Sequence, residues 1–322
     1  MNEEEVYLKI QEIYAKIQKE IGKVVIGQEE VLEQIMVCIL TDNHALLEGF
    51  PGLGKTLLVS SISKILELKF SRIQCTPDIM PSDIMGTYII EETDGKKNFR
   101  FEQGPVFANI VLADEINRAT PKSQSALLEA MQERQVTVGK VTHPLEKPFF
   151  VLATQNPIEM EGTYPLPEAQ LDRFLLKISV GYPAIEDERK IVDLYTSEYK
   201  PDIGKILDRR RFLILNDLTR KMPISNEMKQ YALNIVCATR PQNGGEIASK
   251  YIDYGASPRA SIGLVLAAKA RALLHGRSYV NKEDVETMAF PVLRHRIILN
   301  FESDRKGITQ DDIIGNIIKR TK

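Results

Sequence analysis

The stretch GFPGLGKT, residues 49–56, decides the fold of this chain. It follows a short apolar run, opens an amphipathic helix and fits the pattern G-x-x-x-x-G-K-[ST]. Such a glycine-rich turn lets backbone N–H groups converge on a phosphate chain, while the helix N-terminus adds its partial positive charge. We expect Lys55 to reach the β and γ phosphates of a triphosphate, and the Thr56 hydroxyl to coordinate Mg²⁺, which prefers oxygen ligands. The residues predicted to hold the nucleotide here are Gly49, Pro51, Gly52, Leu53, Gly54, Lys55, Thr56 and Leu57.

The same letters could form an ordinary tight turn between a strand and a helix. At an average glycine usage of roughly 7%, a chance match in a chain of this length has odds of about one in a hundred. The strand before the turn and the helix after it lower those odds, so the stretch predicts nucleotide binding.

Short apolar runs separated by helical stretches predict buried parallel strands, and therefore an α/β sandwich. The predicted strands cover residues 44–47, 70–73, 110–113, 149–153 and 175–180. An amphipathic helix with apolar positions at Val6, Ile10, Ile13 and Ile17 precedes them.

The last third of the chain reads as a small helical domain. A weakly patterned section, residues 200–208, is the candidate boundary, and we place the two domains at residues 1–204 and 205–322. Helices are predicted over residues 225–239, 257–275 and 281–292, with no convincing strand between them. Ser257 and Pro258 suit the start of a helix, which places Arg259 at its exposed beginning.

Acidic and polar side chains follow two of the predicted strands. Asp114 and Glu115 end one strand, and Asn156 follows the next. Ligands of open α/β folds bind at the carboxyl ends of parallel strands, so Asp114 is expected to hold Mg²⁺ and Glu115 to deprotonate the attacking water. Asn156 is expected to position that water, although Asn also makes ordinary turns. Arg173 lies on a short predicted helix, where a salt bridge to a neighbouring acid is the alternative role.

Composition favours a folded protein that acts in the cytoplasm. Hydrophobic residues at 43% and charged residues at 27% are ordinary for a globular chain. The net charge of −2 lacks the basic excess typical of proteins that bind nucleic acid. The three cysteines are far apart, which argues against a disulfide framework or a zinc site, and we expect neither a signal peptide nor a membrane span.

Four long segments resemble the MoxR family of AAA+ ATPases. They are GFPGLGKT, LADEINRATPKSQSALLEAMQERQVTVGK at residues 112–140, LATQNPIEMEGTYPLPEAQLDRF at residues 152–174, and GASPRASIGL at residues 255–264. The segments occur in the family's order at plausible spacing, and the resemblance covers the chain from about residue 26 to residue 292.

The resemblance implies an AAA+ domain with a five-stranded parallel sheet, a helical lid, and assembly into a ring, usually a hexamer, with ATP and Mg²⁺ between neighbours. It implies that Asn156 is sensor 1. Arg173 matches the arginine finger, which would reach the γ-phosphate of the adjacent subunit and neutralise transition-state charge. Arg259 matches sensor 2, which would contact phosphate in its own subunit. A weaker match assigns the adenine pocket to Val25, Ile26 and Gly27.

Residues 99–107 resemble the family's insertion in helix 2, and residues 136–147 resemble the hairpin before sensor 1. Such loops couple hydrolysis to a client, although simple surface packing explains them almost as well. Arg118 and Arg134 are candidates for contacts between subunits, or for exposed helix charges.

Three functions remain open from the sequence. The resemblance implies a chaperone that remodels, matures or activates partner proteins, typically those with a von Willebrand factor A domain. A nucleic-acid motor is the second, since replication helicases share these insertions, but the charge balance argues against it. The third is a nucleotide-dependent scaffold with little turnover; Glu115 and Arg173, both present at their motif positions, argue against it.

Overall fold

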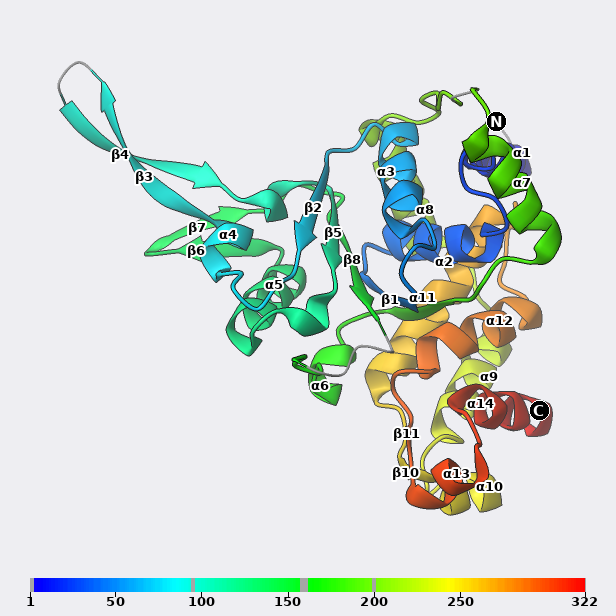
Figure 1. Cartoon of the computed structure of the whole chain (residues 1–322). Helices are drawn as coiled ribbons and strands as arrows, with labels where there is room; N and C mark the ends of the chain where they lie inside the picture. Colours follow the sequence, from blue (N-terminus) through cyan, green and yellow to red (C-terminus); the bar gives the residue numbers. More distant parts are fainter. Residues whose placement is uncertain (1–2, 94–95, 157–161, 199–200, 322) are drawn as a thin grey trace.

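A computed structural model describes residues 3–93, 96–156, 162–198 and 201–321. Its centre is a parallel sheet of five strands in the order β2-β5-β8-β1-β9 (Figure 1). All four neighbouring pairs in this sheet are parallel. The predicted strands are confirmed with small changes at their ends. The strands are β1 (Ala45–Gly49), β2 (Phe70–Gln74), β5 (Ile110–Asp114), β8 (Phe150–Gln155) and β9 (Leu176–Val180).

Alternate side chains of the strands enter two different hydrophobic cores. In β5, Ile110 and Leu112 pack into one core while Val111 and Ala113 pack into the other. Successive side chains of a strand point to opposite faces, so a strand covered on both faces must be apolar throughout. The first core is covered by helices α1 (Glu3–Ile21), α2 (Glu29–Leu40) and α3 (Lys55–Ile65), and the second by α5 (Pro121–Glu133).

The second part of the chain is helical, as predicted, apart from two short strands. Its three predicted helices are present, and Ser225, Ser257 and Asn281 cap their N-termini with side-chain hydrogen bonds. The prediction missed an antiparallel pair, β10 (Ile252–Tyr254) with β11 (Ile298–Leu299). The helices are α8 (Arg209–Lys221), α9 (Asn226–Cys237), α10 (Gly245–Tyr251), α11 (Pro258–Leu274), α12 (Lys282–Leu293), α13 (Phe301–Lys306) and α14 (Gln310–Arg320).

The segment before α8 has no regular secondary structure over residues 201–208. Residue 200, where the predicted boundary section begins, lies outside the described residues. The division into residues 1–204 and 205–322 stays a prediction.

Two hairpins extend from the sheet domain. The strands β3 (Gly86–Thr93) and β4 (Lys96–Gln103) follow the short helix α4 (Pro81–Met85) and project far from the body of the molecule (Figure 1). The shorter hairpin of β6 (Gln135–Val138) and β7 (Val141–Pro144) lies at its base, where the Phe101 and His143 rings stack with centroids 4.0 Å apart. Of the regions that resembled family insertions, residues 99–103 lie in the longer hairpin and residues 136–144 in the shorter one.

Arg134 points into the fold. It ends α5 in the left-handed conformation (φ 55°). Its guanidinium donates to the backbone carbonyls of Phe149 and Asp42. Through these contacts Arg134 connects α5 to the segments that precede β1 and β8. They do not support the alternative of an exposed helix charge.

Arg134→Ala is therefore expected to lower the free energy of unfolding by about 2 kcal/mol, because two part-buried carbonyls lose their donor. Chemical denaturation measures this. Arg211→Ala is the matched control: Arg211 pairs with Asp208 at 3.5 Å, but its side chain is 72% exposed. Such pairs contribute roughly 0–1 kcal/mol, so equal losses in the two variants would contradict an inward role for Arg134.

Candidate active site

The glycine-rich turn joins β1 to α3 and requires glycine for its backbone shape. Gly52 and Gly54 have φ values of +82° and +72°, a region that side chains disfavour, although no atom lies within 4 Å of where their Cβ would be. Lys55 opens α3, and its Nζ donates to the Gly49 carbonyl at 2.7 Å. The turn thus presents the N-terminus of α3 and a lysine to one cavity.

That cavity, here called the phosphate cavity, has a volume of about 440 Å³. It brings together residues that the sequence predicted from three separate motifs. Its lining includes Pro51, Gly52, Leu53, Gly54, Lys55, Thr56, Leu57, Asp114, Glu115 and Asn156. Burial lowers the pKa of the Lys55 ammonium, while Asp114 and Glu115 oppose that shift. The cavity therefore places one partly buried cation opposite two carboxylates.

A threonine that was not predicted from the sequence holds the Asp114 carboxylate and the Glu115 backbone. The Thr154 hydroxyl donates to Asp114 Oδ1 at 2.6 Å and accepts from the Glu115 backbone N–H at 2.9 Å. Glu115 has φ 57°, an uncommon value for a residue with a side chain. Such strained positions are found at functional sites when their surroundings hold them, and Thr154 supplies that support here.

Two polar residues of β2 also contact the carboxylates, and neither was predicted from the sequence. Arg72 donates to Asp114 Oδ2 at 2.6 Å and to Gln74 Oε1 at 2.7 Å. Gln74 donates to Glu115 Oε2 at 3.3 Å. Alternation was the available signal: residues two apart in a strand share a face, so Arg72 in the predicted strand over residues 70–73 and Gln74 directly after it indicated a polar face near the carboxyl edge.

Arg118 also contacts the Glu115 carboxylate. Its Nε is 3.2 Å from Glu115 Oε2, one helical turn away along the chain. This contact is within the subunit, and the prediction of a contact between subunits has no support from it.

The oxygen atoms here suit Mg²⁺. Thr56 and Asp114 line the phosphate cavity, and hydroxyl and carboxylate oxygens are ligands that Mg²⁺ prefers. Within the described ranges, no three His, Cys, Asp or Glu side chains gather as a metal cluster. A site with few protein ligands fits Mg²⁺, which retains several waters and binds through phosphate oxygens.

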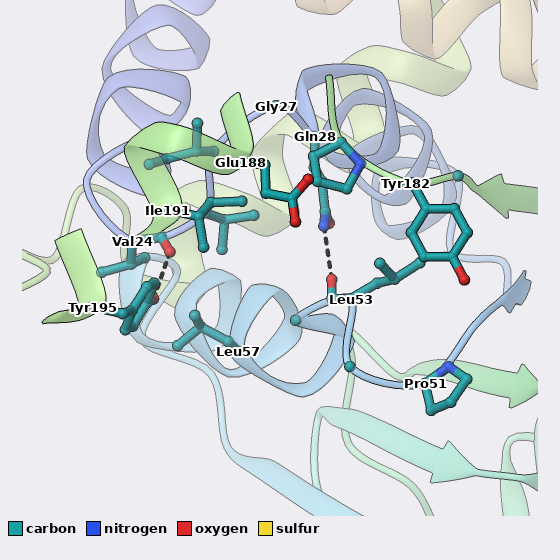
Figure 2. Close-up of a pocket in the computed structure, with 16 residues that line it drawn as sticks. Val24, Gly27, Gln28, Pro51, Leu53, Leu57, Tyr182, Glu188, Ile191 and Tyr195 are labelled. Atoms are coloured by element: carbon teal, nitrogen blue, oxygen red, sulfur yellow. Dashed lines mark hydrogen bonds between the residues drawn. The ribbon is translucent and has the colours of Figure 1, made fainter. Parts of the chain in front are cut away.

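A second cavity of about 490 Å³, here called the base cavity, lies beside the first and is mainly apolar (Figure 2). The predicted segment Val25, Ile26 and Gly27 lines it. A further part of the lining, which was not predicted from the sequence, comes from α7 (Ile185–Thr196) and includes Tyr195. Gln28 donates to the Leu53 carbonyl at 2.7 Å, and the Tyr195 hydroxyl donates to the Val24 carbonyl at 2.7 Å. An apolar slot next to a phosphate cavity fits a flat aromatic base.

Of the described residues predicted for the site, neither Arg173 nor Arg259 lines the phosphate cavity. Arg173 follows α6 (Glu168–Leu171) and shares a separate surface hollow with Glu129 and Glu133. Arg259 lies 3.5 Å from the carboxylate of Asp172, with 53% of its side chain exposed. The structure thus separates both arginines from the phosphate site of their own chain.

Asp172 also pairs with Arg296, a buried arginine of the helical part. Arg296 donates to Asp172 Oδ1 at 2.6 Å, and its side chain is only 3% exposed. The Ser257 hydroxyl donates to the other carboxylate oxygen at 3.1 Å. Asp172 therefore anchors the start of α11 to the sheet domain, next to Arg173.

Comparisons with known proteins agree with this geometry. Residues 44–176 match the family described as "ATPase family associated with various cellular activities (AAA)", and residues 245–317 match the AAA lid domain. The chain is 45% identical to Chaperone MoxR1 of Mycobacterium tuberculosis over 303 residues, which is 93% of this chain and 79% of that protein. It is 32% identical to Protein MoxR of Methylorubrum extorquens, covering 92% of this chain and 91% of that protein.

One solved structure has nearly the same fold. A crystal structure of a protein from Cytophaga hutchinsonii, proposed to be an ATPase, matches with a TM-score of 0.91 and 45% identity, covering 99% of this chain and 97% of that one. Among the helices that the structure describes, none is both long and apolar enough to cross a bilayer.

Proposed function

The chain belongs to the MoxR family of AAA+ ATPases, and on that premise we propose that it is a Mg²⁺-ATP-dependent chaperone that assembles into a ring and remodels partner proteins. The observation that carries this proposal is the phosphate cavity, whose lining combines Lys55, Thr56 and Asp114 with Glu115 and Asn156. Such a set holds a triphosphate, a metal and a reacting water within reach of one another.

Substrate binding rests on the turn and on two cavities. The backbone N–H groups around Gly52 and Gly54 and the Lys55 ammonium would hold the phosphates, while the base cavity would take adenine. Thr56 and Asp114 would hold Mg²⁺, which when bound neutralises phosphate charge.

Hydrolysis needs a base and a group that orients water. Glu115 would accept a proton from the attacking water. The oxygen of the water would bond to the γ-phosphorus while the bond between that phosphorus and the ADP oxygen breaks. Asn156 would orient that water through its carboxamide. Thr154, which contacts both Asp114 and the Glu115 backbone, would keep the two acids in place.

Two arginines would complete the site only when subunits and lid move into position. Arg173 lines a separate hollow and not the phosphate cavity of its own chain, which supports a role at the γ-phosphate of a neighbouring subunit. Arg259 is held to Asp172 by a long contact of 3.5 Å. Exposed ion pairs contribute little, so a γ-phosphate would attract Arg259 away at small cost.

The projecting β3–β4 hairpin supports a contact with client proteins. Ile90 and Phe99 are paired across its two strands and are 62% and 76% exposed. Large exposed apolar side chains on a projecting element mark binding surfaces. Aromatic stacking of Phe101 on His143 would transmit movement between the two hairpins.

The finer identity of the partners rests on the family resemblance. We propose clients with a von Willebrand factor A domain and a ring of six subunits. A cytoplasmic location is supported by the three cysteines, which are all free thiols, since reducing compartments keep thiols unpaired.

Capture of partners tests the proposal. A tagged Glu115→Gln chain should retain specific proteins in the presence of ATP and release them in ADP. The same proteins retained equally in both nucleotides would contradict ATP-driven remodelling. Tight binding to DNA that weakens steeply as salt is added would favour the nucleic-acid motor instead.

A further inference from the structure

Arg72 occupies one oxygen of the proposed metal ligand. Asp114 Oδ1 accepts from Thr154 at 2.6 Å, and Asp114 Oδ2 accepts from Arg72 at 2.6 Å. Both carboxylate oxygens of Asp114 therefore have donors, and one of the two donors carries a full positive charge. The bond is charge-assisted, with the Arg72 side chain 47% exposed and the Asp114 side chain 17% exposed.

The Arg72 side chain extends along β2 to reach Asp114. In the register of the sheet, Arg72 lies opposite Leu112, and Gln74 lies opposite Asp114. The Arg72 side chain therefore reaches two residues toward the carboxyl edge, and Gln74 accepts a second hydrogen bond from the same Nη2 atom. That orientation brings Arg72 into the lining of the phosphate cavity with Lys55 and Thr56.

The charge has two opposite effects on what binds in this cavity. A guanidinium next to Asp114 repels a divalent cation and competes for the same oxygen. The same guanidinium attracts nucleotide phosphates, because Arg presents a planar fork of donors suited to phosphate oxygens.

We propose that Arg72 is a resident cation of the phosphate cavity that occupies the metal's place at Asp114, competes with Mg²⁺ for it, and supports nucleotide binding when Mg²⁺ is scarce. The proposal rests on the proposed function, since it presupposes that nucleotide and Mg²⁺ bind here. When Mg²⁺ takes Asp114, Arg72 exchanges this carboxylate for phosphate oxygen.

Binding of fluorescent ADP to the full chain separates the two effects without hydrolysis. Arg72→Ala should weaken ADP binding in EDTA by roughly fivefold, the scale of one partly exposed charge pair. The same variant should lower the Mg²⁺ concentration that gives half of the metal-dependent gain, also by roughly fivefold. Mg²⁺ binding to free ADP is identical in every sample, so differences between variants report on the protein.

Three further variants define the result. Arg72→Gln removes the charge and keeps much of the side chain, so it should repeat both changes even if the alanine variant folds poorly. Arg72→Lys keeps the charge and should stay closer to the wild type. Arg100→Ala is the matched control: Arg100 also lies on a strand and pairs with an acid, Glu91 at 3.3 Å, but on the distant hairpin. It should change neither quantity.

A merely structural role for Arg72 would not make its loss weaken ADP binding and at the same time lower the Mg²⁺ requirement. If Arg72→Ala and Arg72→Gln weaken ADP binding and also raise the Mg²⁺ requirement, Arg72 only shapes the site, and the proposal is overturned. An unchanged Mg²⁺ requirement overturns it as well. If the wild-type chain binds no ADP under any Mg²⁺ concentration, the proposed function itself fails.

Discussion

Glu115→Gln is expected to leave nucleotide binding intact and to cut ATP turnover by roughly a hundredfold or more, the usual scale for losing a positioned base. Glutamine keeps the size of the side chain and can still form hydrogen bonds in the cavity, but it cannot take up a proton from water. Glu115 directly follows β5 and lines the phosphate cavity, and its backbone N–H donates to the Thr154 hydroxyl. Phosphate release and ADP binding, measured on the same sample, separate the two effects.

Glu302→Gln provides the control for this prediction. Glu302 is an exposed carboxylate of α13 that pairs with Lys306 at 2.7 Å, so its amide should leave turnover unchanged. Turnover of Glu115→Gln at the wild-type level would remove Glu115 from its role as the base.

Arg173→Ala is expected to abolish hydrolysis, and mixing it with a Lys55→Ala chain should restore part of the activity. Arg173 lies beside Glu129 and Glu133 and does not line the phosphate cavity of its own chain. In a mixed ring, a Lys55→Ala subunit can supply Arg173 to a neighbour whose Lys55 is intact. Removal of one group that stabilises transition-state charge costs several orders of magnitude in rate for such ATPases, roughly 10³-fold or more.

Arg259→Ala is the matched control for the mixing experiment. Lys55 and Arg259 are expected to serve the same subunit's nucleotide, so a mixture of Lys55→Ala and Arg259→Ala chains contains no complete site and should remain inactive. Light scattering verifies that the chains assemble together. Recovery in both mixtures, or in neither when assembly is complete, would contradict a role for Arg173 across the interface.

The sequence predicted the sheet and most of the phosphate cavity because both depend on local patterns. Buried parallel strands are continuous apolar runs, and the residues directly after them lie at one edge of the sheet. This is why Asp114, Glu115 and Asn156 could be placed near Lys55 without a structure. The wall of the base cavity contributed by Tyr195 was missed, because it depends on how α7 packs against Val24.

Charged side chains were the hardest to place from sequence. Arg72, Arg134 and Arg173 all lie in or beside predicted elements, and spacing alone does not tell which arginine lines the phosphate cavity, which bonds to backbone carbonyls and which lines a separate hollow. The structure separates them through partners: Asp114 for Arg72, two backbone carbonyls for Arg134, and a surface hollow for Arg173. Similarly, β10 and β11 escaped prediction because strands of two or three residues carry no alternation to detect.

Calorimetric titration of the purified chain with ATP and Mg²⁺ tests most directly whether the cavity around Lys55, Thr56 and Asp114 binds nucleotide. We expect saturable binding with one site per chain, and its loss in Lys55→Ala while the thermal unfolding transition is retained. No saturable binding by the wild-type chain up to about 1 mM ATP, the upper end of the usual range for enzyme substrates, would contradict it.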